Sequence, residues 1–134
     1  MLHESLTREI LAACFEVGTE LGHGFLEAVY ERALSIALRQ RGLEVATQVP
    51  LAVTFRGQVV GEYAADMVVA DKVLVELKAV QALLPEHQAQ VINYLKATGL
   101  GIGLLVNFGT PRVGYKRCYW KRQDGQAEHD RQDG

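Results

Sequence analysis

Apolar positions in the first forty residues recur at helical spacing. In the first stretch they lie three or four positions apart, at Leu6, Ile10, Ala13, Cys14, Val17 and Leu21. This pattern predicts an amphipathic helix over about the first twenty residues, ended by the Gly-His-Gly at 22–24. A second helix is predicted from about Phe25 to Arg41, with Gly42 as its C-cap. The short linker favours a helical hairpin.

From Gln48 onward the apolar period changes to two. Runs rich in β-favouring residues cover 49–55, 59–69 and 72–80, and each predicts a strand. The connections between them are too short for a crossover, which needs a dozen or more residues. The three strands are therefore predicted to form an antiparallel meander.

The second half of the chain adds a helix and one or two further strands. Pro85 suits the first turn of a helix that runs to about Thr98. The continuous apolar run 100–108 predicts a fully buried strand, reached through that helix as a crossover. Residues 113–121 favour another strand. The sequence thus predicts one domain over residues 1–122 and a polar, disordered tail at 123–134.

Composition fits a single domain with an ordinary hydrophobic core. The chain has 134 residues, of which 49% are hydrophobic and 22% charged. It holds no run of the roughly 18–20 apolar residues that a membrane span needs, so we expect a cytoplasmic protein with no membrane partner. Cys14 and Cys118 match no metal or redox spacing and are predicted to be free thiols. The net charge of −2 excludes nucleic-acid binding through overall basicity and leaves only local contacts.

A charged pair interrupts the apolar strand predicted at 72–80. Glu76 and Lys78 point to one face of that strand, where a buried charge is costly unless it is paired or bound to a metal. An odd-length loop at 70–72 lets Asp66, on the preceding strand, face the same way as Glu76. Two carboxylates with the backbone carbonyl of Leu77 form an oxygen set that suits Mg²⁺ or Mn²⁺. Lys78 would then position or deprotonate the attacking water. A surface ion pair is the alternative interpretation.

Residues on the predicted helices extend this candidate site. Glu27 lies in the first turn of the second helix, as a further metal-site acid or as an acid favoured by the helix dipole. Gln90 and Tyr94 are four positions apart and share a helix face, with His87 one turn earlier. Gln90 is a candidate for contact with a phosphate. The alternative is that Gln90 and His87 are solvated helix residues.

A basic and aromatic segment follows at residues 115–122. It interleaves tyrosines and a tryptophan with Lys116, Arg117, Lys121 and Arg122. Such interleaving is typical of a surface that binds nucleic acid, and an edge strand protected by charge is an equal alternative.

Taken together, these motifs resemble the GxxExxY protein family, a compact branch of the PD-(D/E)xK nuclease-like superfamily. The matching positions are Gly24-x-x-Glu27-x-x-Tyr30, Asp66, Glu76-Leu77-Lys78, the segment 90–96 and the run 103–109. The resemblance extends from the first helix to about Arg117. It implies an α/β (α+β) fold with a restriction-endonuclease-like αβββαβ core, in which helices flank a mixed central sheet.

The resemblance also implies roles for single residues. Asp66 and Glu76 would be metal ligands, Lys78 the catalytic lysine, Glu27 an auxiliary acid, and Gln90 with Tyr94 supports of the site. Ala65 stands where the superfamily's proline precedes the aspartate. The implied activity is Mg²⁺- or Mn²⁺-dependent hydrolysis of DNA, and a chain this short leaves specificity to a homodimer, a partner chain or DNA structure. A catalytically silent binding module and a structural protein are the alternatives.

Overall fold

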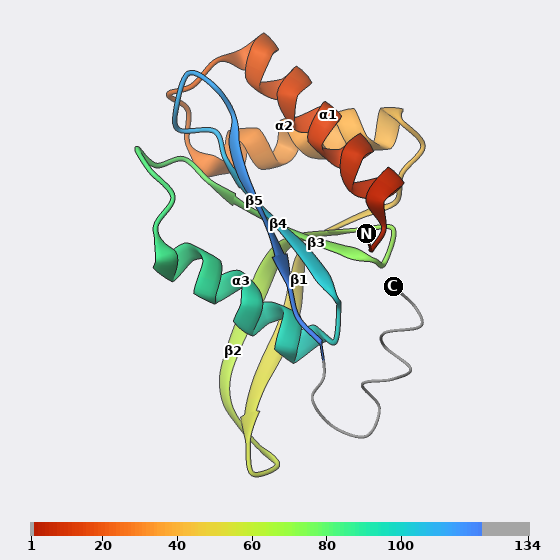
Figure 1. Ribbon diagram of the computed structural model, residues 1–134, viewed down its shortest axis with the longest axis vertical. Helices are drawn as coiled ribbons and strands as arrows, with labels where there is room; N and C mark the ends of the chain where they lie inside the picture. The colour runs from red at the N-terminus through yellow and green to blue at the C-terminus, as the bar shows by residue number, and fades with distance from the viewer. Residues whose placement is uncertain (1, 122–134) are drawn as a thin grey trace.

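Five strands form one mixed sheet with helices on both faces (Figure 1). The computed structural model describes residues 2–121. The elements in chain order are α1 (Glu4–Leu21), α2 (Glu27–Gln40), β1 (Val45–Phe55), β2 (Gln58–Val69), β3 (Val73–Lys78), α3 (Pro85–Thr98), β4 (Ile102–Asn107) and β5 (Gly114–Tyr119). The sheet order is β1-β2-β3-β4-β5. Only β3 and β4 are parallel, because α3 carries the chain back between them.

One face of the sheet is covered by α1 and α2, which form the predicted hairpin. Ile10 and Cys14 from α1 and Leu34 from α2 pack with alternate residues of the central strands, among them Val75 and Leu104. This alternation follows from the period of two along a strand. The larger part of the core therefore lies between the sheet and the two N-terminal helices.

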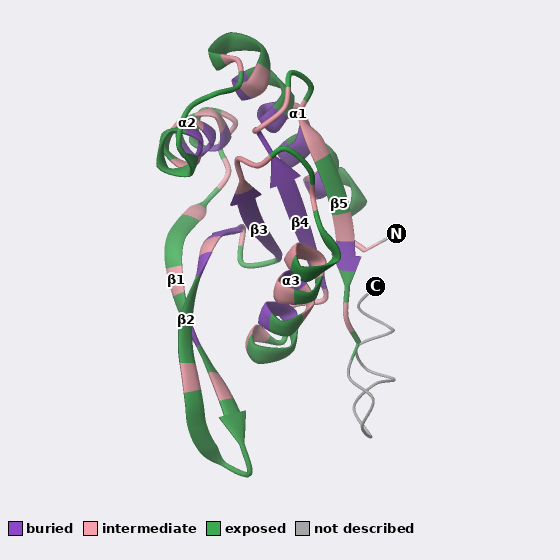
Figure 2. Cartoon of the chain, turned by 90° about the vertical axis from the view of Figure 1, so that its left-hand side faces the viewer, coloured by how far each residue is buried: buried purple, intermediate pink, exposed green. Residues whose placement is uncertain are grey.

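The opposite face is covered by α3 alone. Val91 and Leu95 pack there with Leu74 and Leu105, which point away from α1 and α2. Gly103 allows the close approach of the helix, since a Cβ at this position would lie 2.7 Å from Cγ1 of Val91. Strands β3 and β4 are buried on both faces (Figure 2), which explains why β4 is apolar up to Asn107 and β3 is apolar apart from Glu76 and Lys78.

The β1–β2 hairpin extends past the rest of the sheet, and its distal part is exposed (Figure 2). The strand predicted at 49–55 begins earlier than expected, at Val45, which pairs with Val69. That extension was missed because Gln48 breaks the alternation with a left-handed backbone, at φ 49°. Strand β3 ends at Lys78, two residues before the predicted end, because the backbone of Val80 bonds to the side chain of Asn107.

The final strand is present as β5, and Cys14 and Cys118 are both free and buried. Between residues 2 and 121, no helix combines the length and the apolar character that crossing a membrane requires. The polar tail predicted at 123–134 lies outside the described residues.

Candidate metal and catalytic site

Asp66 and Glu76 face each other where regular pairing between β2 and β3 ends. The ladder runs from Val69↔Val73 to Met67↔Val75, so these two acids are the next pair in register. The N–H of Asp66 donates to Oε1 of Glu76 at 2.7 Å, and the N–H of Leu77 donates to Oδ2 of Asp66 at 2.7 Å. Each carboxylate is thus held in place by a backbone N–H of the opposite strand. The register agrees with the odd-length loop at 70–72.

An irregularity in β1 lies beside this pair. Gln48 sits between Thr47, which pairs with Met67, and Val49, which pairs with Ala65, yet Gln48 itself pairs with no residue of β2. Its left-handed backbone costs about 1–3 kcal/mol for a non-glycine residue, and such strain often accompanies functional sites. The break leaves the N–H of Asp66 available for Glu76.

Burial makes Glu76 an unusual acid. Only 4% of the residue is exposed. Burial raises the pKa of Glu76 to about 8, the negative charge of Asp66 adds to the rise, and the ammonium of Lys78 opposes it. A divalent cation between two such carboxylates would relieve both their repulsion and their desolvation. The acid pair therefore fits a hard metal ion.

Leu77 contributes backbone groups next to the acid pair. Its N–H faces Asp66, and the N–H and C=O of one strand residue point to the same side of the strand. The carbonyl of Leu77 is therefore directed toward β2, and its place among the metal ligands stays a prediction.

Lys78 ends β3, half-buried and on the same face as Glu76. Its own carbonyl accepts a bond from the N–H of Phe108 at 2.8 Å, which fixes the strand end against β4. The lysine thus lies one pleat along from the acid pair on an anchored strand.

Asn107 and Gly109 support that strand end, and sequence reasoning gave them no role. Oδ1 of Asn107 accepts from the N–H of Val80 at 3.0 Å and of Gly109 at 2.9 Å, while its Nδ2 donates to the carbonyl of Val80 at 2.9 Å. A Cβ at Gly109 would lie 2.3 Å from the backbone of Val80. A buried asparagine closing an apolar run, followed by a glycine two residues later, was the available signal.

Gln90 and Tyr94 form a hydrogen-bonded pair on α3, and Tyr94 lies near the acids. Nε2 of Gln90 donates to the hydroxyl of Tyr94 at 3.3 Å. Burial raises the pKa of Tyr94, and the charge of Glu76 raises it further, so the phenol lies within electrostatic reach of the acid pair. The structure therefore brings together Asp66, Glu76, Lys78 and this helix pair.

His87 and Glu27 stand apart from the acid pair. Nδ1 of His87 accepts the N–H of Leu84 at 3.0 Å, so one side of the ring caps α3. Glu27 is exposed in the first turn of α2. Within residues 2–121 no group of three or more His, Cys, Asp or Glu side chains is placed to hold a metal. The auxiliary role of Glu27 stays a prediction.

Tyr30, the last residue of the Gly-x-x-Glu-x-x-Tyr motif, is buried and contacts other groups of the protein. Its ring stacks on Phe108 with centroids 4.7 Å apart. Its hydroxyl donates to the carbonyl of Gly22 at 2.6 Å and accepts the N–H of Phe25 at 3.2 Å. The tyrosine thus fixes the linker that leads into Glu27.

The predicted basic segment is divided between the two faces of the sheet. Cys118 packs on the α3 side, whereas Tyr115 contacts Phe15 of α1, so neighbouring Lys116 and Arg117 point to opposite faces. The guanidinium of Arg117 lies 5.5 Å from the centroid of Tyr115. Lys121 is exposed after β5, and Arg122 lies outside the described residues.

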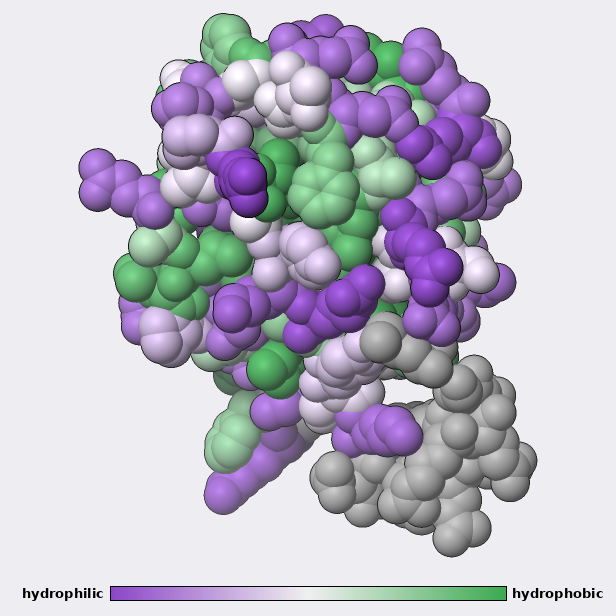
Figure 3. Space-filling view, turned by 45° about the horizontal axis from the view of Figure 1, so that its top comes forward, coloured by the Kyte–Doolittle hydropathy of each residue, from purple (hydrophilic) through white to green (hydrophobic). Residues whose placement is uncertain are grey.

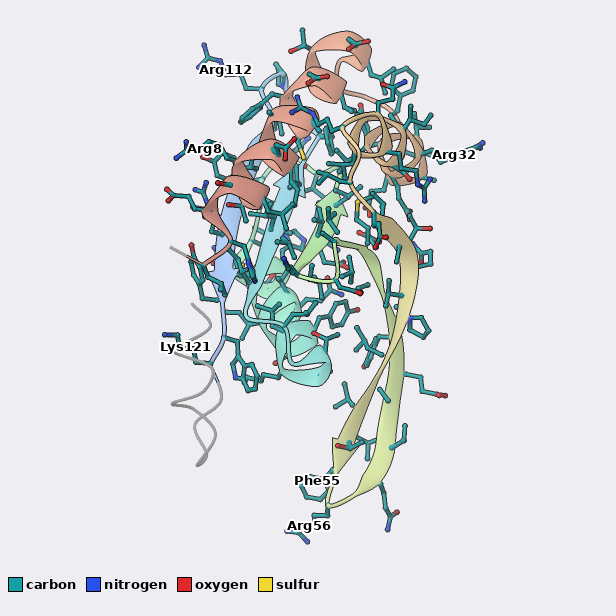
Figure 4. The ribbon with its side chains drawn as sticks, turned by 90° about the vertical axis from the view of Figure 1, so that its right-hand side faces the viewer. Arg8, Arg32, Phe55, Arg56, Arg112 and Lys121 are labelled. Atoms are coloured by element: carbon teal, nitrogen blue, oxygen red, sulfur yellow. The ribbon has the colours of Figure 1, made fainter. Side chains whose placement is uncertain are left out.

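Other cations are spread over the surface. In Figure 4, Arg8 and Arg112 project on one side, Arg32 on the opposite side, and Arg56 at the tip of the hairpin. The space-filling view shows apolar and hydrophilic side chains interspersed on the face toward the viewer (Figure 3). These labelled cations do not form one basic face.

Comparison with known proteins places the chain in a family. Residues 4–118 match the model of the PD-(D/E)XK nuclease superfamily. The chain belongs to this superfamily, and the predicted α+β, restriction-endonuclease-like class is confirmed. Its narrower likeness to the GxxExxY family stays a prediction.

A solved structure shares the fold. The chain is similar to the protein in "Crystal structure of SSO0001", at 18% sequence identity and a TM-score of 0.57. The match covers 79% of this chain and 55% of that chain, so this chain spans about half the length of its structural relative. A comparison with curated proteins finds no match.

Proposed function

We propose that the chain is a divalent-metal-dependent nuclease that hydrolyses phosphodiester bonds in DNA in the cytoplasm. The observation that carries this proposal is that the carboxylates of Glu76 and Asp66 each accept a backbone N–H of the opposite strand, from Asp66 and Leu77 respectively, which holds both acids beside Lys78. Superfamily membership supports the nuclease class, and members typically use divalent metal ions. Mg²⁺ or Mn²⁺ suits this donor set because all of its donors are oxygens.

The ligands would be Asp66, Glu76 and the carbonyl of Leu77. One oxygen of each carboxylate is held by a backbone N–H, which orients the other oxygen for an ion. When bound, a divalent ion supplies Lewis acidity toward the phosphate and lowers the pKa of a bound water. Because the pKa of Glu76 is about 8, the residue carries a proton near neutral pH that a bound ion must displace. Metal binding is therefore expected to strengthen as the pH rises toward 8.

The remaining side chains act directly on the substrate. The Lys78 ammonium is placed to stabilise negative charge that develops on the phosphate or to orient the attacking water. Gln90 and Tyr94 present an amide and a phenol from α3, and both can donate hydrogen bonds to a phosphate oxygen. Their mutual bond holds both side chains in one orientation.

A cleavage assay tests this proposal. Supercoiled plasmid and single-stranded DNA are incubated with Mg²⁺ or Mn²⁺ and wild type, Glu76→Gln or Lys78→Met. Each variant is expected to lose at least about 100-fold in rate, because each removes a group that holds the ion or stabilises the transition state. RNA and a labelled DNA end, run in parallel, report the substrate and the direction of cleavage.

Matched controls come from the exposed residues Glu20 and Lys72. Glu20→Gln and Lys72→Met remove the same charges away from the acid pair and are expected to leave the rate within about 2-fold. Activity that survives both site variants rejects this site. DNA binding by wild type without any cleavage favours the silent binding module instead.

A further inference from the structure

A cleft of about 900 Å³ lies between the β1–β2 hairpin and α3, and its lining includes Tyr94, which lies within electrostatic reach of the acid pair. One wall is formed by residues 52–54 of β1 and Tyr63 of β2, and the other by one face of α3. Alanines at 52, 89 and 97 keep it open. Ligand pockets usually measure about 300–1,000 Å³, so this cleft can admit one or a few nucleotides and is too small for a duplex segment.

The cleft is continuous with the proposed catalytic site. Tyr94, which lies within electrostatic reach of Glu76, lines the cleft together with its hydrogen-bond partner Gln90. A nucleotide chain whose phosphate lies at the acids can therefore place a neighbouring nucleotide in the cleft. Lys96 lines the same space and offers a cation for the backbone of that nucleotide.

Tyr63 presents an aromatic surface inside this cleft. It precedes Asp66 by three residues on β2, and 52% of it is exposed. Its ring packs against Tyr94 with centroids 5.8 Å apart and an angle of 42° between the planes. It also lies over Gly61, where a Cβ would come within 2.9 Å of Cε2. The ring is braced by Tyr94 and Gly61 while much of it remains accessible.

We propose that this cleft is a nucleobase subsite, in which Tyr63 stacks on an unpaired base next to the scissile phosphate. Exposed aromatic rings in grooves bind bases by stacking, and every base offers a π-face. A base inside a duplex has both faces covered by its neighbours, so only a single-stranded stretch, a frayed end or a gap can supply one. The inference rests on the proposed function, because the nuclease site gives the cleft its substrate.

Fluorescence anisotropy with a labelled 12-nucleotide oligothymidylate and a labelled blunt duplex tests the subsite. The titrations are done in EDTA, so that metal-dependent cleavage cannot interfere. Tyr63→Ala is expected to weaken binding of the single strand by roughly 5- to 100-fold. Tyr63→Phe keeps the stacking ring and is expected to bind within about 2-fold of wild type.

Phe15 provides the control, since 44% of it is exposed on α1, which covers the face of the sheet opposite α3. Phe15→Ala is expected to leave binding unchanged. Unaltered single-strand binding by Tyr63→Ala overturns the subsite, as does an equal loss in Phe15→Ala or a wild-type preference for the duplex. Thermal unfolding of the two Tyr63 variants shows whether any loss comes from misfolding.

The two proposals fail in different ways. If wild type cleaves no nucleic acid while Tyr63→Ala loses single-strand binding, the nuclease proposal fails and the subsite stands. If cleavage depends on Glu76 while Tyr63→Ala binds as wild type does, the subsite alone is wrong.

Discussion

The pKa of Glu76 lies far above the ordinary value of a glutamate side chain. Without a metal its pKa lies near 8, raised by burial and by Asp66, whereas the unfolded chain has a value near 4.5. The folded state therefore holds this proton more tightly than the unfolded state. The stabilisation that protonated Glu76 contributes is fully present below pH 4.5, and it is lost as the pH rises from there through about 8.

In EDTA we therefore expect the free energy of unfolding to fall across this pH range by an amount on the order of a few kcal/mol. Glu76→Gln carries no ionisable group and should flatten the fall, as measured by urea unfolding at several pH values. Glu20→Gln, on the surface, should follow wild type. A Glu76→Gln profile parallel to that of wild type would show that the buried carboxylate is not the cause.

At the scale of elements, Asn107 joins the end of β4 to the chain that leaves β3. Replacing it with alanine leaves three backbone groups of Val80 and Gly109 without their side-chain partner. Asn107→Ala is expected to lower the free energy of unfolding by about 2–4 kcal/mol, because three partly buried backbone groups lose their hydrogen-bond partner. Urea denaturation measures this loss.

Two further variants locate the effect. Asn107→Asp keeps the acceptors and loses only the donor to Val80, so its loss should be intermediate. Asn93→Ala, at an exposed position of α3, should change stability by less than about 0.5 kcal/mol. If Asn107→Ala costs no more than Asn93→Ala, the clamp is not a stabilising feature.

The local sequence pattern predicted helices and strands well where the spacing of apolar residues matches the way the element packs in the structure. The helix from Pro85 to Thr98 and the parallel strand after it follow directly from proline, glycine and continuous apolar residues. The start of β1 at Val45 could not be predicted, because it depends on pairing with Val69 across a left-handed Gln48. Pairing partners far apart in sequence leave no local periodicity.

Residues of the candidate site were likewise predictable only where the signal lies in the local sequence. Glu76 and Asp66 stood out because charge in an apolar strand is rare, and the loop at 70–72 gave their register. The contribution of Asn107 was hidden, since its three bonds exist only after β3 and β4 lie side by side. Tyr63 likewise gains its place only when α3 brings Tyr94 against it.

At the scale of the whole molecule, charge is dispersed. The net charge is −2, and the cations marked in Figure 4 project on different sides. We therefore expect few phosphate contacts, and a plot of log K for DNA binding against log salt should have a slope shallower than about −4. Anisotropy titrations at several salt concentrations measure it. A slope near −6 or steeper would reveal an extended basic surface.

The proposed nuclease site requires that Asp66 and Glu76 together hold one divalent ion. Isothermal titration with Mn²⁺ at pH 8 measures this binding, with Glu20→Gln as the control and Glu27→Gln as a probe of the proposed auxiliary acid. We expect one site in wild type and in Glu20→Gln, and its loss in both Asp66→Asn and Glu76→Gln. Absence of binding by wild type into the millimolar range, or a site that both variants retain, would contradict it.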